Sequence, residues 1–89
     1  MAWVIELDRA AERELDKLDP QAARRILTFL YKRLSLLEDP RSIGQALSGA
    51  KLGSFWKYRV GDYRIISSIE DKRLVILILK VGNRREVYQ

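Results

Sequence analysis

The sequence predicts one α+β domain over residues 1–89, in which a helical hairpin packs on one side of an antiparallel-rich sheet in the order β-α-α-β-β-β. Two observations predict this class. Apolar residues recur at helical spacing between residues 8 and 39, and with a period of two after residue 54. A length of 89 residues allows one domain and leaves no room for a second.

The N-terminal part predicts one strand and two helices. Trp3–Leu7 is short and rich in residues that favour strands. Asp8 is suited to cap a first helix, which ends at Asp19-Pro20, where an Asp cap and a Pro at the first helical position begin a second helix. The second helix is expected to run to Asp39-Pro40. The expected apolar stripes are Ala11, Leu15 and Leu18 on the first helix, and Ala23, Ile26, Leu27, Leu30, Leu34 and Leu37 on the second.

Three further apolar residues, Phe29, Tyr31 and Leu36, lie off the main stripe of the second helix. They widen its apolar surface beyond what one packing face requires. This pattern favours a partner that covers the remaining surface.

The C-terminal part predicts a connecting segment over residues 41–54 and then three strands, at 55–60, 63–70 and 73–81. Gly61-Asp62 has glycine at the first central position, as a two-residue type II′ hairpin turn requires. Asp71-Lys72 is a weaker turn signal that does not fix the loop length. Leu74–Leu79 has no polar alternation, which indicates a central strand covered on both faces.

The composition excludes several classes of chemistry. The chain has no Cys and no His, so disulfides, thiol nucleophiles, common zinc sites and imidazole catalysis are excluded, and no metal or cofactor is expected. The apolar run Leu74–Leu79 is far shorter than the roughly 20 residues of a membrane helix. Acidic residues follow the N-terminus where a signal peptide would be basic and then apolar. We therefore expect a cytoplasmic protein without a membrane partner.

The net charge of +5 is unevenly distributed. Residues 1–50 hold eight basic and eight acidic side chains, whereas residues 51–89 hold nine basic and four acidic ones. A basic protein can use this charge for solubility alone or for binding a polyanion, and net charge does not decide between these alternatives.

The predicted hairpin brings three cations together. With Gly61-Asp62 as a two-residue turn, Arg59 lies opposite Arg64, and Lys57 projects from the same face as Arg59. Two arginines in direct opposition repel each other, and the only acid close by in the hairpin is Asp62. The arrangement predicts a phosphate-binding site, with a solvated face of splayed side chains as the alternative.

The C-terminal segment adds groups of similar chemistry. Arg84 and Arg85 follow a strand that should lie beside the one carrying Arg64. The planar arginine fork can donate two parallel hydrogen bonds to phosphate, and the ring of Tyr88 can stack on a base.

These residues resemble a known family over the whole chain. The run FWKYRVGDYRII at 55–66, the strand at 74–81 and the ending VGNRREVY at 81–88 are similar to the RelE branch of the RelE/ParE toxin superfamily. The resemblance implies the toxin of a type II toxin–antitoxin pair, an endoribonuclease that cuts messenger RNA in the ribosomal A site and binds an acidic antitoxin. The ParE relatives share the fold, usually lack the cationic set and inhibit DNA gyrase.

The resemblance also assigns roles to residues. It implies attack of a ribose 2′-hydroxyl on the adjacent phosphate, without a metal, to leave a 2′,3′-cyclic phosphate. Arg59 stands where some members have Lys, and Asn83 where many have His or Lys, so the proton route stays open. A plain nucleic-acid-binding module remains a third alternative. The expected catalytic residues are Lys57, Arg59, Arg64, Arg84 and Tyr88, and the expected RNA-binding residues are Lys51 and Arg85.

Overall fold

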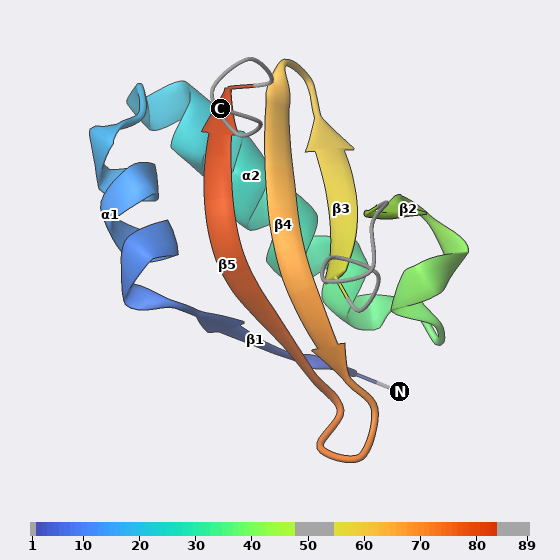
Figure 1. Ribbon diagram of the computed structural model, residues 1–89. Coiled ribbons are helices and arrows are strands. Elements are labelled where there is room, and N and C mark those ends of the chain that lie inside the picture. Colours follow the sequence, from blue (N-terminus) through green and yellow to red (C-terminus); the bar gives the residue numbers. More distant parts are fainter. Residues whose placement is uncertain (1, 48–54, 84–89) are drawn as a thin grey trace.

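The computed structural model describes residues 2–47 and 55–83, which form two helices and a five-stranded sheet (Figure 1). Two short 3₁₀ turns, Leu34–Leu36 and Pro40–Ser42, connect the helices to the sheet. The helices and strands are β1 (Val4–Leu7), α1 (Arg9–Lys17), α2 (Pro20–Lys32), β2 (Gln45–Ala46), β3 (Phe55–Val60), β4 (Tyr63–Glu70) and β5 (Val75–Asn83).

The sheet has the order β1-β5-β4-β3-β2. β1 pairs with β5 in parallel, and the other three pairings are antiparallel, which confirms the predicted antiparallel-rich sheet. β5 lies between β1 and β4 and is therefore an inner strand, but the predicted central position belongs to β4. Leu77 and Leu79 of β5 are only half-buried, so the strand is not fully covered on both faces as its unbroken apolar run predicted.

Both helices contribute to one core on one face of the sheet. α2 crosses behind the strands in Figure 1, and α1 lies beside β5. Ile26 and Leu30 of α2 are fully buried against sheet residues such as Ile65 and Ile78. The predicted α+β class is confirmed. The opposite face of the sheet carries the cations of the β3–β4 hairpin together with buried apolar residues such as Ile66 and Val75.

The predicted starts of both helices are confirmed by their caps. Asp8 Oδ2 accepts a hydrogen bond from the backbone amide of Ala10 at 3.1 Å. Asp19 Oδ2 accepts one from Ala22 at 3.3 Å, and Pro20 occupies the first helical position. These bonds satisfy amides that the first turn of a helix leaves without an intrahelical partner.

The predicted extent of the second helix is wrong: α2 ends at Lys32 rather than near Asp39-Pro40. The chain continues as a 3₁₀ turn in which Ser35 Oγ donates to the Tyr31 carbonyl at 2.8 Å. The Ser35 carbonyl accepts from the backbone amide of Trp3 at 2.8 Å, so this turn also holds the start of β1. Leu34 remains fully buried, because a 3₁₀ turn keeps apolar residues three apart on one side.

The predicted β3–β4 hairpin is confirmed, including its register. Val60 pairs with Tyr63 across Gly61-Asp62. Gly61 has a φ of 60°, whereas Asp62 lies outside the left-handed region, as a type II′ turn requires. The next connection is longer than Asp71-Lys72 alone, because Glu70 pairs with Val75 around a four-residue turn in which Leu74 has a φ of 54°. β5 accordingly covers Val75–Asn83 rather than residues 73–81.

One strand was absent from the sequence prediction. Within the segment predicted as a connection, Gln45–Ala46 forms β2, which pairs with Lys57 and Trp56 of β3. Gly44 precedes it with a φ of 79°, in the left-handed region that favours glycine.

Candidate active site on the β3–β4 hairpin

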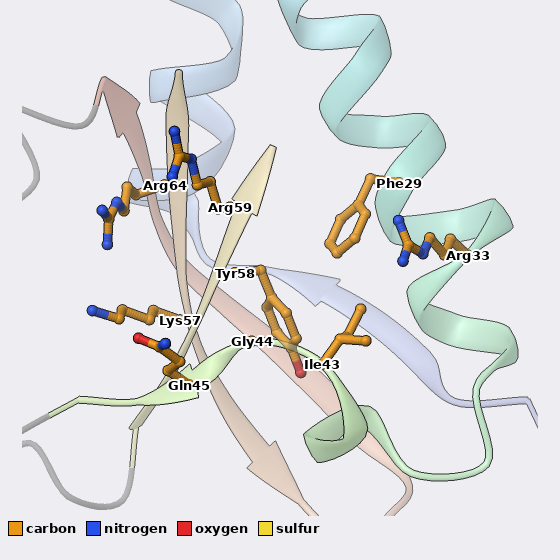
Figure 2. Close-up of a pocket in the computed structure, with 9 residues that line it drawn as sticks. All are labelled: Phe29, Arg33, Ile43, Gly44, Gln45, Lys57, Tyr58, Arg59 and Arg64. Atoms are coloured by element: carbon orange, nitrogen blue, oxygen red, sulfur yellow. The ribbon is translucent and has the colours of Figure 1, made fainter. Parts of the chain in front are cut away.

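A cavity of about 430 Å³ lies along the edge of β3, where β2 ends (Figure 2). Its walls come from α2, the segment before β2, and the β3–β4 hairpin. The lining residues are Phe29, Arg33, Ile43, Gly44, Gln45, Lys57, Tyr58, Arg59 and Arg64.

The three cations predicted from the hairpin all line this cavity. Arg59 and Arg64 are direct cross-strand partners, and Lys57 stands two residues from Arg59, so the three side chains project from one face of the sheet. Figure 2 shows them on the same side of β3. Arg64 is also opposite Gly82 of β5, which has no side chain to crowd it.

The cavity is positively charged, and its described lining residues include no acidic side chain that would offset this charge. Among the described residues, those lining it include four cations, with Arg33 as the fourth, and no carboxylate. The described ion pairs join Arg41 to Asp71 and Arg73 to Glu6 and Glu70, near the β4–β5 turn at the other end of the hairpin. A cavity with this composition favours an anionic ligand such as phosphate.

The floor of the cavity is held by a buried tyrosine. Tyr58 is 2% exposed, and its hydroxyl donates to the Pro40 carbonyl at 2.6 Å. Burial raises the pKa of Tyr58 well above its ordinary value, so this hydroxyl keeps its proton. Its ring meets that of Phe29 with centroids 5.7 Å apart, and the guanidinium of Arg33 lies 5.9 Å from the Phe29 centroid. Tyr58 is therefore a structural support rather than a base.

The wall formed by the segment before β2 is fixed by further bonds. Trp56 Nε1 donates to the Ile43 carbonyl at 2.7 Å. Arg41 binds both carboxylate oxygens of Asp71 at 2.9 and 3.0 Å, which lowers the pKa of Asp71. A Cβ on Gly44 would collide with the Lys57 carbonyl and would lie 2.8 Å from Trp56 Nε1. Only glycine fits here, and its close approach brings Gln45 into register with Lys57.

The sequence analysis predicted three of the nine described lining residues, and the six that it missed include Gln45 and Arg33. Gln45 lies on β2, which is too short to produce an alternating pattern, and Arg33 lies at the end of α2. Gly44 was the available signal, because glycine often marks a close approach of two backbones.

The remaining expected site residues, Lys51, Arg84, Arg85 and Tyr88, lie outside the described residues. The last described residue, Asn83, pairs with Tyr63, next to Arg64.

Comparison with known proteins gives the family. Residues 5–88 match the model of the family described as ParE toxin of type II toxin-antitoxin system. The chain belongs to the RelE/ParE toxin superfamily. It is thus a toxin of a type II toxin–antitoxin system, as its residues predicted.

Individual relatives of this RelE/ParE toxin fall in the RelE branch. Toxin RelG from Mycobacterium tuberculosis is 29% identical over 100% of this chain and 99% of that protein. The mRNA interferase toxin RelE from Escherichia coli is 29% identical over 99% of this chain and 92% of that protein. A solved structure, the toxin–antitoxin complex RelBE2 from Mycobacterium tuberculosis, superposes with a TM-score of 0.85 and 27% identity, over 97% of this chain and 95% of that one.

None of the helices that the structure describes in this toxin is long and apolar enough to cross a membrane.

Proposed function

We propose that this RelE/ParE toxin is a metal-independent endoribonuclease that cuts messenger RNA in the ribosomal A site, in the cytoplasm. The observation that carries the proposal is the cavity on the β3–β4 hairpin, whose charged lining residues among those described are all cations. A relative that this chain matches over 92% of the relative's length is named an mRNA interferase toxin, which agrees with this chemistry.

The proposed reaction is an internal transfer at one phosphate. The ribose 2′-oxygen attacks the adjacent phosphorus, the bond from phosphorus to the 5′-oxygen breaks, and a 2′,3′-cyclic phosphate remains. The proton of the 2′-hydroxyl passes to the amine of Lys57, and the leaving 5′-oxygen takes a proton from water. Lys57 is assigned this role because the guanidinium groups of its neighbours do not deprotonate in proteins.

Arg64 is assigned to the non-bridging phosphate oxygens. Charge grows on these oxygens in the transition state, and donors held in place beforehand stabilise it without reorganisation. Arg64 projects from the inner part of the hairpin beside Gly82, and it is half-buried, so its position is more restricted than that of exposed Arg59. We assign Arg84 to the same phosphate, Lys51 and Arg85 to the RNA backbone, and Tyr88 to stacking on a base.

Dependence on the ribosome follows from what the cavity lacks. The chain has no His, so the most common general base in proteins is absent. Holding the 2′-hydroxyl and the phosphate in line can lower the barrier by several kcal/mol, and a ribosome that fixes the messenger can supply this alignment.

The proposed inhibitor is an acidic antitoxin that binds across the exposed face of α2. Of the three apolar residues predicted off the main stripe, Tyr31 on α2 is 48% exposed and Leu36 in the following 3₁₀ turn is 62% exposed. Phe29 instead packs against Tyr58, so the surface left uncovered is smaller than predicted. A shallow hollow beside Tyr31 is lined by apolar Leu27 and by basic Arg24 and Lys32. Such a surface suits an amphipathic acidic segment that folds on binding.

The alternative function is inhibition of DNA gyrase, because the matching family model is that of ParE toxins. The discriminating experiment incubates the purified toxin separately with ribosomes loaded with a defined messenger, with the same messenger alone, and with gyrase and plasmid. We expect cleavage only on the ribosome, mapped by primer extension, and unchanged supercoiling. Inhibited supercoiling without cleavage would instead establish the alternative.

A further inference from the structure

The cavity on the β3–β4 hairpin is rich in hydrogen-bond donors and poor in acceptors. Arginine offers no acceptor, and a lysine nitrogen offers one only in its uncharged form, in which it serves here as the base. The hydroxyl of Tyr58 is buried and already bonded to the Pro40 carbonyl. Among the described lining residues, the remaining side chain that carries an acceptor is Gln45, through its amide oxygen.

Gln45 is placed at the position where the proposed chemistry needs an acceptor. It pairs directly with Lys57, so both side chains project from the same face, and Figure 2 shows them next to each other. Gln45 is exposed to the cavity rather than packed in the core. The Trp56–Ile43 bond and the close approach of Gly44 hold β2 in this register.

A ribose hydroxyl is the part of an RNA substrate that such an acceptor would recognise. The phosphate oxygens only accept hydrogen bonds, so the arginines can bind them. The 2′-hydroxyl, in contrast, must donate a hydrogen bond while one of its lone pairs faces phosphorus. An amide oxygen can accept this bond. A hydroxyl carries one proton, so the bond to Gln45 belongs to the bound substrate before reaction. An amide is not a base, so as the attack begins the hydroxyl rotates and gives this proton to the amine of Lys57, the cross-strand neighbour of Gln45.

We propose that the amide oxygen of Gln45 accepts a hydrogen bond from the 2′-hydroxyl at the scissile phosphate, so that Gln45 orients the attacking oxygen and selects RNA over DNA. This inference depends on the proposed endoribonuclease function. It assigns a role in substrate recognition to a residue that belongs to β2 and not to the cationic hairpin.

The test measures binding and not cleavage. Ribosomes are loaded with a messenger in which the 5′-bridging oxygen at the cut position is a methylene group, so that the RNA cannot be cleaved. Two versions carry either a hydroxyl or a hydrogen at the 2′ position. We expect the wild-type toxin to bind the hydroxyl version about three- to tenfold more tightly, as one hydrogen bond predicts.

The informative variant is Gln45→Met, which keeps the length of the side chain and removes the amide. We expect it to bind both messengers with the affinity that the wild-type toxin has for the 2′-hydrogen version. Gln21→Met, an exposed substitution on α2, is the matched control and should keep the preference for the hydroxyl.

The outcomes separate this inference from the function on which it depends. If Gln45→Met keeps the wild-type preference, or loses affinity equally for both messengers, Gln45 does not contact the 2′-hydroxyl. If the wild-type toxin neither binds loaded ribosomes nor cleaves ordinary messenger, the proposed function fails and the inference fails with it. Circular dichroism of each variant confirms that a loss of binding is not a loss of folding.

Discussion

At the scale of single residues, the arginines facing each other across the hairpin are the informative feature. Arg59 and Arg64 are direct partners in a sheet, where like charges reduce stability. Arg59 partly turns away, since its Nε donates to the Gly61 carbonyl at 3.3 Å. Two like charges held this close suit a site for a bound anion, because the anion offsets the repulsion between the two guanidinium groups.

Replacing Arg64 with alanine should therefore separate activity from stability. We expect Arg64→Ala to lower ribosome-dependent cleavage by about 10²- to 10³-fold, the effect of removing one preorganised donor. The free energy of unfolding should stay level or rise by up to about 0.5 kcal/mol, because the repulsion with Arg59 is relieved. Single-turnover cleavage and urea unfolding measure the two effects.

The matched control is Arg73→Ala, which removes an exposed cation near the β4–β5 turn, where it pairs with Glu6 and Glu70. It should leave cleavage unchanged. A large loss of stability in Arg64→Ala would contradict our assignment and make Arg64 a structural residue.

Tyr88 can be tested by two substitutions that remove different properties. If its ring stacks on a messenger base, Tyr88→Phe should keep part of the cleavage activity and Tyr88→Ala very little, since base stacking contributes about 1–3 kcal/mol. Cleavage rates on loaded ribosomes provide the measurement. Equal and complete loss in both variants would assign the role to the hydroxyl, and undiminished activity in Tyr88→Ala would remove Tyr88 from the site.

The sequence predicted the part of the site whose geometry is set by the turn between β3 and β4. Gly61-Asp62 fixes a two-residue hairpin, and from this turn the positions of Lys57, Arg59 and Arg64 follow by counting. Gln45 could not be found in this way, because its pairing depends on a contact between Gly44 and the β3 backbone, far along the chain.

At the scale of elements, the segment between α2 and β3 shows how tertiary contacts decide local structure. The apolar spacing correctly predicted that Leu34 is buried, yet the helix gives way to a 3₁₀ turn. Both geometries bring residues three apart to one side, so the pattern does not distinguish them. The bonds at Ser35, one to Tyr31 and one from Trp3, favour the tighter turn.

Gly44 should be intolerant of any side chain. We expect Gly44→Ala to destabilise the protein by more than about 2 kcal/mol, because left-handed backbone alone costs an L-residue about 1–2 kcal/mol and the new Cβ also collides with the Lys57 carbonyl. Gly61→Ala is the control: its φ is also positive, but its nearest neighbour is the flexible end of Arg25 at 3.4 Å. If both variants lose equal stability in urea unfolding, the collision is not significant.

The Arg41–Asp71 pair should make the anchoring of the segment before β2 depend on pH. Arg41 lowers the pKa of Asp71 below its ordinary value of 3.8 in the folded state. The pair therefore contributes stability above that value and loses it as the pH falls through the lowered pKa. We expect Asp71→Asn to be less stable than wild type at pH 7, with the difference disappearing in acid; urea unfolding across this range measures it. A difference independent of pH would contradict this account.

At the scale of the whole molecule, the two faces of the sheet are divided between stability and function. The helices cover one face and build the core, and the cations of the hairpin occupy the other. The exposed side of α2 points away from the sheet, so an antitoxin bound there and a messenger bound at the hairpin use different surfaces.

The proposed antitoxin-binding surface on α2 can be tested by placing a negative charge on it. We expect Tyr31→Glu to weaken binding of an acidic antitoxin at least tenfold, because it places a negative charge on an exposed apolar position of α2. Val4→Glu, at an equally exposed apolar residue of β1, is the control. Isothermal titration with the cognate antitoxin, once it has been identified, measures both affinities. Equal affinities would show that the antitoxin binds elsewhere.

The parallel pairing of β1 with β5 has a consequence for the synthesis of the protein. Val4 of β1 pairs with Val75 of β5, so β1 can join the sheet only after the ribosome has synthesised β5. Arg64 is held on β4 against this same strand. While β5 is still inside the exit tunnel, the nascent chain can form its helices but not the complete sheet. Each new molecule thus completes the sheet that holds Arg64 only after β5 has left the tunnel, so the candidate active site forms last.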